Sequence, residues 1–177
     1  MEYNDDLRYI AEQLDKELTG ISKIVTELGD DKTDDPLIIC DIKEKALNRF
    51  IIENKSVILD RLFAFYKPIF DGIEKLGYKI ERDGEHVYLI NYSPLGEELY
   101  ETIYLDGEEV ITFQLYKHYD NFDEVDHVYA LLEAKRNGLG GVPSIKELIQ
   151  DAGCIQEMFN ELQLTAYNLY PLCRKAA

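Results

Sequence analysis

The spacing of apolar residues changes period at Gly77, and this change constrains the fold more than any other feature of the sequence. Before Gly77 the spacing is helical, and after it four runs alternate between apolar and polar residues: 78–82, 86–92, 99–105 and 109–117. Asp83-Gly84 separates the first two runs, and Asp106-Gly107 separates the last two. Asp-Gly between alternating runs is typical of β-hairpins, because a type I′ turn needs positive φ at both central residues. The sequence therefore predicts two hairpins in series, a four-stranded antiparallel meander over 78–117.

Helical spacing is clearest near the N-terminus. Apolar residues recur there at steps of three and four: Leu7, Ile10, Leu14, Leu18, Ile21, Val25 and Leu28. This heptad-like repeat is typical of a helix that packs along another helix. One interpretation is a helix on the core of its own domain. The other is a homodimer seam formed by Leu7, Leu14, Leu18, Ile21, Val25 and Leu28. Gly20 weakens such a helix by up to about 1 kcal/mol, which partner packing would have to offset.

Two further helices are predicted after the acidic turn at 30–36. The first covers about 37–52, and the second covers 57–76 with Ser56 as its N-cap. The second segment is apolar on nearly all sides, which is typical of the central helix of a domain. Pro68 predicts a kink in it, since proline removes one backbone donor and crowds the preceding turn.

Helical patterns return after the meander, over about 123–137, 145–152 and 155–170. Ser144 and Glu147 fit a capping box at the entry to the second of these helices. The last two helices, joined by Gly153-Cys154, have the spacing of a helix-turn-helix. The second of them lacks the Lys and Arg that contacts to DNA phosphates require, so we expect it to serve as scaffold or to contact protein.

The order of helices, then a meander, then helices indicates the α+β class and a single compact domain over 1–177. Its parts are an acidic helix and turn at 1–36, core helices at 37–77, the meander at 78–117 and C-terminal helices at 123–172. With 177 residues, 46% of them hydrophobic, the chain has enough apolar material for a core. That composition excludes a disordered acidic chain, which lacks the apolar surface to offset the entropy lost on folding.

Three further features indicate the compartment. The N-terminus carries acids where a signal peptide carries bases, and no run of about 18 apolar residues occurs. The three cysteines are an odd number without CxxC spacing, which fits reduced thiols better than disulfides or zinc ligands. We therefore expect a cytoplasmic protein without a membrane segment.

The net charge of -16 is confined to two segments. Residues 1–36 hold 11 acids and 4 bases, and residues 78–126 hold 13 acids and 3 bases, whereas the rest of the chain is close to neutral. Direct binding of nucleic acid over a broad face is disfavoured, because phosphate contacts need clustered Lys and Arg. The acidic segments instead mark candidate surfaces for a basic protein partner.

Alternation along the second predicted hairpin assigns two faces to the sheet. Leu99, Ile103 and Leu105 point inward, and the opposite face is rich in tyrosine and threonine with a rim of glutamates. The predicted binding surface comprises Tyr88, Tyr92, Glu97, Glu98, Tyr100, Glu101, Tyr104, Glu108, Glu109 and Tyr116. Tyrosine is enriched at protein interfaces because it offers large amphipathic area. The alternative is a solvated sheet face, or one covered by the C-terminal helices.

Chemistry-bearing motifs are scarce. The segment 117–127 concentrates two histidines with carboxylates, so His118, Asp120, Asp123 and His127 are the best candidates for a metal site. Acidic residues before a helix are also expected from the helix dipole alone. No GxSxG, HExxH, Walker or GxGxxG motif occurs, so no catalytic residue and no cofactor is predicted.

The order of a long apolar helix, Leu76-Gly77-Tyr78 and a hairpin ending in Val87-Tyr88-Leu89 resembles the opening of accessory subunits of bacterial condensin-type complexes. The shared pattern is a helix followed by a hairpin, and it implies no particular functional residue. In size and charge the chain also resembles small acidic proteins of phages and mobile elements, including some anti-CRISPR and anti-restriction proteins, which occupy basic surfaces of their targets.

Three functional hypotheses follow. The first is a non-catalytic acidic protein that binds a basic surface of its partner, such as the nucleic-acid-binding surface of a nuclease complex. The second is a structural accessory subunit or chaperone, dimeric through the N-terminal seam. The third is a metal-dependent enzyme using His118, Asp120, Asp123 and His127.

Overall fold

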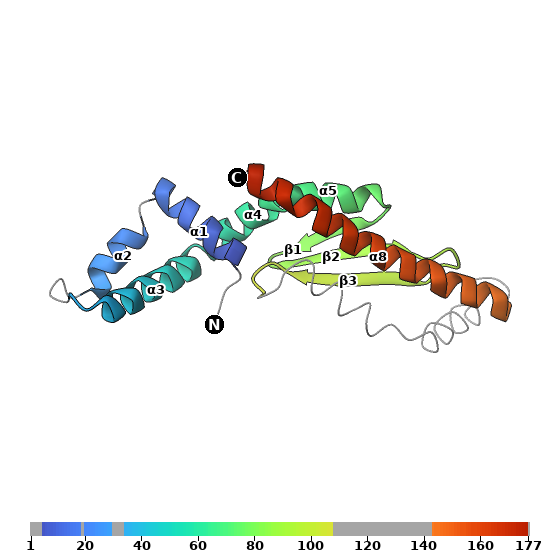
Figure 1. Cartoon of the computed structure of the whole chain (residues 1–177), viewed down its shortest axis with the longest axis horizontal. Coiled ribbons are helices and arrows are strands. Elements are labelled where there is room, and N and C mark those ends of the chain that lie inside the picture. The colour runs from blue at the N-terminus through green and yellow to red at the C-terminus, as the bar shows by residue number, and fades with distance from the viewer. Residues whose placement is uncertain (1–4, 19, 30–33, 108–142, 177) are drawn as a thin grey trace. The chain divides into compact units, whose positions relative to one another are not determined.

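The computed structural model describes residues 5–18, 20–29, 34–107 and 143–176 (Figure 1). Within these ranges it holds six helices and a three-stranded antiparallel sheet, so the mixed helix and strand class is confirmed. The described chain divides into two compact units. The helical unit comprises the residues up to Ala64 with 105–107, and the sheet unit comprises 65–104 and 143–176. The single domain over 1–177 stays a prediction.

The helical unit begins with two helices where the sequence predicts one. Helix α1 (Asp5–Leu18) ends before Gly20, and helix α2 (Ile21–Leu28) begins after it. Asp15 Oδ1 accepts hydrogen bonds from the backbone N–H groups of Gly20 and Ile21, at 2.8 and 2.5 Å, and so satisfies donors at the start of α2. A Cβ atom on Gly20 would lie 2.4 Å from Phe50 Cε2. The break therefore has two causes, a side-chain cap and the close approach of an aromatic ring.

Helix α3 (Pro36–Glu53) contacts both α1 and α2. Asp35 caps it by accepting from the Leu37 N–H at 2.9 Å, and Pro36 occupies its first turn, as expected for a helix start. Besides Leu105, the buried apolar side chains of this unit come from four helices: Leu7, Ile10, Ala11, Leu14, Ile24, Ala46, Leu47, Phe50, Ile51, Ile58, Leu59 and Leu62. The heptad-like pattern of α1 thus packs in the core of its own unit.

The apolar segment predicted as one kinked helix is two helices. Helix α4 (Lys55–Phe65) follows the C-cap of α3 directly, so Ser56 lies inside the helix and is not its N-cap. Helix α5 (Lys67–Lys75) starts after a break at Tyr66, with Pro68 in its first turn. The N–H groups of Ile69 and Phe70 donate to Tyr66 O at 2.9 and 3.1 Å. Proline has no N–H to continue α4, which accounts for the break two residues earlier.

The sheet has strand order β1-β2-β3, all antiparallel. Its strands are β1 (Lys79–Asp83), β2 (His86–Tyr92) and β3 (Glu98–Tyr104). The first predicted hairpin is confirmed with a one-residue shift, because Asp83 pairs with His86 and the turn residues are Gly84-Glu85. Gly84 has a φ of 60°, a conformation that glycine adopts without steric cost. The predicted fourth strand at 109–117 lies outside the described residues.

One continuous helix, α8 (Ile145–Ala176), replaces the two helices predicted there. Gly153 and Cys154 are helical, so the helix-turn-helix interpretation is wrong. A glycine inside a helix costs about 1 kcal/mol, and burial of flanking side chains on one face, including Ala152 and Ile155, offsets that cost. The capping box is confirmed, because Ser144 N donates to Glu147 Oε2 at 2.7 Å and Glu147 N donates to Ser144 Oγ at 3.3 Å.

Helix α8 packs against α5, and both lie beside the sheet in Figure 1. The approach of the two helices is closest at Gly72, where an added Cβ would lie 2.3 Å from Leu169 Cδ1. The predicted helix at 123–137 lies outside the described residues. Among the helices that the structure describes, none is long and apolar enough to cross a membrane.

Candidate functional site: an aromatic and acidic sheet face

One face of the sheet carries the tyrosines that the sequence singles out. Strand alternation and register place Tyr88 and Tyr92 of β2 on the same side as Tyr100 and Tyr104 of β3. Tyr92, Tyr100 and Tyr104 are 57%, 47% and 45% exposed. The opposite side is buried and carries the apolar Val87, Leu89, Leu99 and Ile103. The structure therefore brings these four predicted tyrosines together on one exposed face.

The rings on this face form two close pairs. Tyr88 and Tyr100 are stacked, with centroids 5.4 Å apart and an interplanar angle of 30°. His86 meets Tyr104 edge to face, with centroids 4.8 Å apart and planes at 85°. The His86 and Tyr88 centroids lie 6.2 Å apart and link the two pairs. We call His86, Tyr88, Tyr92, Tyr100 and Tyr104 the tyrosine face. The sequence analysis does not include His86, although it lies two residues before Tyr88 and the strand period of two places both on one face.

Carboxylates border the tyrosine face on two strands. Glu81 and Asp83 of β1 pair in register with Tyr88 and His86, and Glu98 of β3 accepts a hydrogen bond from the Tyr92 hydroxyl at 3.2 Å. Lys79 of β1 forms an exposed ion pair with Glu81. Glu81 and Asp83 were not predicted as site residues, although the same alternation places them on this face.

These carboxylates also act on Tyr100. Desolvation raises the pKa of the Tyr100 hydroxyl above its ordinary value, and the neighbouring Tyr88, Glu81 and Glu98 raise it further. Two carboxylates from β1 and β3 therefore exert their field at the same phenol. This phenol stays protonated at neutral pH, and the region around it favours positive charge.

Glu101 does not belong to this face, which corrects the sequence prediction. It pairs with Leu89 and shares the inner side of β3 with Leu99 and Ile103, and it is only 8% exposed. The strand period of two places residues 99, 101 and 103 on one side, so alternation alone predicts the inward position of Glu101. Burial raises the pKa of Glu101 to about 7.

Tyr78 lies near Glu101 on the buried side. Its hydroxyl is buried without a hydrogen-bond partner among the described residues. Desolvation, followed by the charges of Glu161 and Glu101, raises the pKa of Tyr78. The proximity of the buried Tyr78 and Glu101 was not predicted, because the sequence does not tell which face α8 covers.

The remaining predicted residues lie elsewhere. Glu97 is half-buried in the β2–β3 loop, where its N–H donates to Ser93 Oγ at 3.0 Å and its carbonyl accepts from the Ser93 N–H at 2.8 Å. Of the seam residues, Leu7 and Leu14 are buried, Ile21 and Val25 half-buried, and Leu18 and Leu28 exposed. Outside the described residues are Glu108, Glu109, Tyr116, His118, Asp120, Asp123 and His127.

The described ranges contain no group of three or more His, Cys, Asp or Glu side chains that could hold a metal ion. The metal site predicted around His118 lies outside them, so it stays a prediction. No protein-family model matches the chain, and it matches neither a curated protein nor a solved structure.

Proposed function

We propose that this protein is a non-catalytic binding protein whose tyrosine face binds a basic surface of another protein. The partner would be a nucleic-acid-binding protein, such as a nuclease complex, and binding would inhibit it by occupying the surface that holds phosphates. The observation that carries this proposal is the array of half-buried Tyr88 and exposed Tyr100 and Tyr104, bordered by Glu81 and Glu98.

Two physical features of this face support a protein partner. Tyrosine rings offer large contact area with two side-chain torsions each, so little conformational entropy is lost when a partner covers them. The bordering carboxylates attract a basic partner at long range and disfavour nucleic acid, which carries the same sign of charge. Such binding is steered by charge and weakens as salt rises.

The other acidic segment, 1–36, is a weaker candidate for the binding surface. Two of its carboxylates form ion pairs inside the helical unit. Glu17 pairs with Arg61 at 2.8 Å and Glu27 with Arg49 at 3.1 Å. These pairs use bases of the nearly neutral segment 37–77, so part of the negative charge of 1–36 is already balanced locally.

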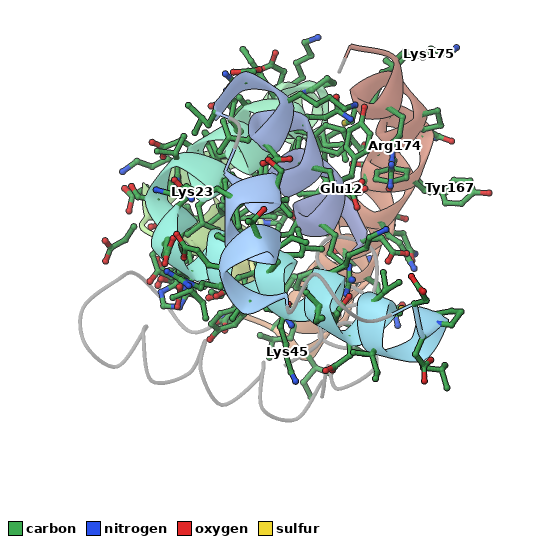
Figure 2. All side chains as sticks on the ribbon, turned by 90° about the vertical axis from the view of Figure 1, so that its left-hand side faces the viewer. Glu12, Lys23, Lys45, Tyr167, Arg174 and Lys175 are labelled. Atoms are coloured by element: carbon green, nitrogen blue, oxygen red, sulfur yellow. The ribbon has the colours of Figure 1, made fainter. Side chains whose placement is uncertain are left out.

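Capture of nuclease complexes by the immobilised protein across a salt series tests the proposal. We expect capture to weaken between about 0.05 and 0.5 M salt, because the Debye length falls from about 14 to about 4 Å over that range. Replacing Tyr88 and Tyr100 with Ala should abolish capture. Tyr167→Ala is the matched control, since Tyr167 is 71% exposed and points away from α8 in Figure 2. Capture that resists salt and survives the tyrosine changes would contradict the proposal.

A second candidate is a structural accessory subunit or chaperone that associates through apolar contact. The observation that favours it is the exposed apolar start of α3, where Leu37, Ile38 and Ile39 are 80%, 47% and 37% exposed. Association through this surface would resist salt, because apolar burial does not depend on charge. Leu37→Glu should then lower the mass of the assembly in solution while leaving the fold intact, and an unchanged mass would count against this candidate.

A further inference from the structure

We propose that the tyrosine face recognises arginine side chains of its partner in preference to lysine, with one guanidinium stacked on Tyr100 between Glu81 and Glu98. This inference rests on the proposed function and names the side chain that the face would select. It also identifies Tyr100 as the residue that determines the selectivity.

The first argument is the position of Tyr100 between two carboxylates. Glu81 pairs in register with Tyr88, and Tyr88 stacks on Tyr100, so Glu81 borders the ring pair from β1. Glu98 lies two residues from Tyr100 on β3 and borders it from the other side. The field of both carboxylates reaches the Tyr100 hydroxyl and raises its pKa. A cation above this ring would therefore have an acidic partner on either side.

The second argument is the shape of the aromatic surface. Tyr88 and Tyr100 are stacked with their planes within 30° of parallel, so Tyr88 covers part of Tyr100, and the aromatic surface left for a partner is the remainder of the Tyr100 ring, whose side chain is 47% exposed. A planar guanidinium stacks on such a surface and directs its N–H donors outward to carboxylates in a fork. The ammonium of lysine is a compact and strongly hydrated charge, which gains the Coulomb attraction but not the stacking.

The third argument is that the chain's own base on this face is easily displaced. The Lys79 side chain that pairs with Glu81 is 71% exposed. An ion pair this exposed contributes little to stability, so an incoming arginine can replace Lys79 at little cost. Arg82 of β1 does not compete, because alternation places it on the other side of the sheet and its Nε donates to Gly84 O at 2.9 Å.

Titration of the full chain with three fluorescent peptides tests the inference. The peptides share a Gly-Ser background and carry four arginines, four lysines or four citrullines, and fluorescence anisotropy reports binding. At about 0.15 M salt we expect the arginine peptide to bind about tenfold more tightly than the lysine peptide, as a desolvated cation–π contact allows. The citrulline peptide keeps the planar group without the charge and should not bind measurably.

Four variants test which residues produce the preference for arginine over lysine. Tyr100→Leu should bring the affinities for the arginine and lysine peptides to within about twofold of each other, whereas Tyr100→Phe should retain the preference because the ring remains. Combining Glu81→Gln with Glu98→Gln should weaken both cationic peptides. Tyr167→Leu should leave the affinities for all three peptides unchanged, because Tyr167 is an exposed tyrosine of α8 and not part of the tyrosine face. A circular dichroism spectrum of each variant checks that the fold is retained.

The outcomes separate this inference from the proposed function. Equal binding of arginine and lysine peptides that depends on Glu81 and Glu98 would overturn arginine selectivity and leave an acidic binding face. Binding that no tyrosine-face variant alters would overturn both. Absence of binding by either cationic peptide would overturn arginine selectivity, while capture of nuclease complexes that depends on Tyr88 and Tyr100 would still support the proposed function.

Discussion

Ser93 Oγ donates a buried hydrogen bond of 2.7 Å to Asp151 Oδ2, across 58 positions of the sequence. The other oxygen of Asp151 accepts from the Leu95 N–H at 2.8 Å. Ser93 and Leu95 belong to the loop that joins β2 to β3, whereas Asp151 lies on α8. A buried carboxylate of α8 thus fixes the link between the two strands that carry the tyrosine face.

Asp151→Ala is expected to destabilise the protein by about 2–4 kcal/mol. The change leaves a buried hydroxyl and a backbone N–H without their acceptor, and hydrogen bonds to charged groups contribute more than neutral ones. Urea denaturation followed by circular dichroism measures the free energy of unfolding. Glu157→Ala is the control, because Glu157 is exposed on the same helix and its removal should cost less than about 0.5 kcal/mol. Equal effects of the two changes would show that the buried hydrogen bonds contribute little.

Because Glu101 is buried, we expect the free energy of unfolding to fall as pH rises through neutrality. Burial raises the pKa of Glu101 from its ordinary value of 4.5 to about 7 in the folded chain. Between these values the folded state binds the proton more tightly than the unfolded state, so the free energy of unfolding decreases with rising pH and levels off above about pH 8. A backbone hydrogen bond from Thr102 acts in the opposite direction, because it favours the charged carboxylate, but desolvation is the larger effect.

Glu101→Gln is expected to remove this slope and to stabilise the protein at pH 8 by about 1–3 kcal/mol relative to wild type. Thermal unfolding between pH 5 and pH 8 checks the prediction. Glu98→Gln, on the exposed side of the same strand, is the matched control and should retain the slope of wild type. A wild-type slope of opposite sign would refute the burial of an ionisable Glu101.

The first hairpin and the start of α3 were predictable from the sequence because their causes are local. A glycine at a tight turn marks the link between β1 and β2, and Asp35 followed by Pro36 marks a helix start within two residues. The capping box of Ser144 and Glu147 is equally local. At each of these places the residues that determine the conformation are neighbours in the chain.

Two features that the sequence did not predict depend on residues far apart in the chain. The break at Gly20 depends on the ring of Phe50, and the continuity of α8 through Gly153 depends on burial of one helix face. The tyrosines of the candidate site were predicted because a strand has a period of two. Glu101 departs from the sequence prediction because this charged residue lies on the inner side of its strand, where alternation places it.

Replacement by alanine is expected to have opposite effects on stability at two glycines, Gly72 and Gly153. A methyl group on Gly72 would lie 2.3 Å from Leu169 Cδ1 and 2.9 Å from Thr165 Cγ2, so Gly72→Ala must separate α5 from α8 or shift these side chains. We expect it to destabilise the protein by about 1–3 kcal/mol, the usual cost of overpacking. No atom lies within 4 Å of the Cβ position at Gly153, so Gly153→Ala should stabilise α8 by up to about 1 kcal/mol. Urea denaturation distinguishes them, and stabilisation by both changes would contradict the close helix packing at Gly72.

Leu14 and Leu18 occupy successive positions of the heptad-like pattern in α1 but differ in burial. Leu14 is 3% exposed in the core of the helical unit, whereas Leu18, one step further along the same pattern, is 52% exposed. Leu14→Ala should therefore destabilise the unit by about 2–5 kcal/mol, and Leu18→Ala by less than about 1 kcal/mol. Urea denaturation gives both values, and sedimentation equilibrium gives the mass of each variant. If Leu14→Ala lowered the mass in solution without lowering the free energy of unfolding, Leu14 would belong to a dimer seam and not to the core of its own unit.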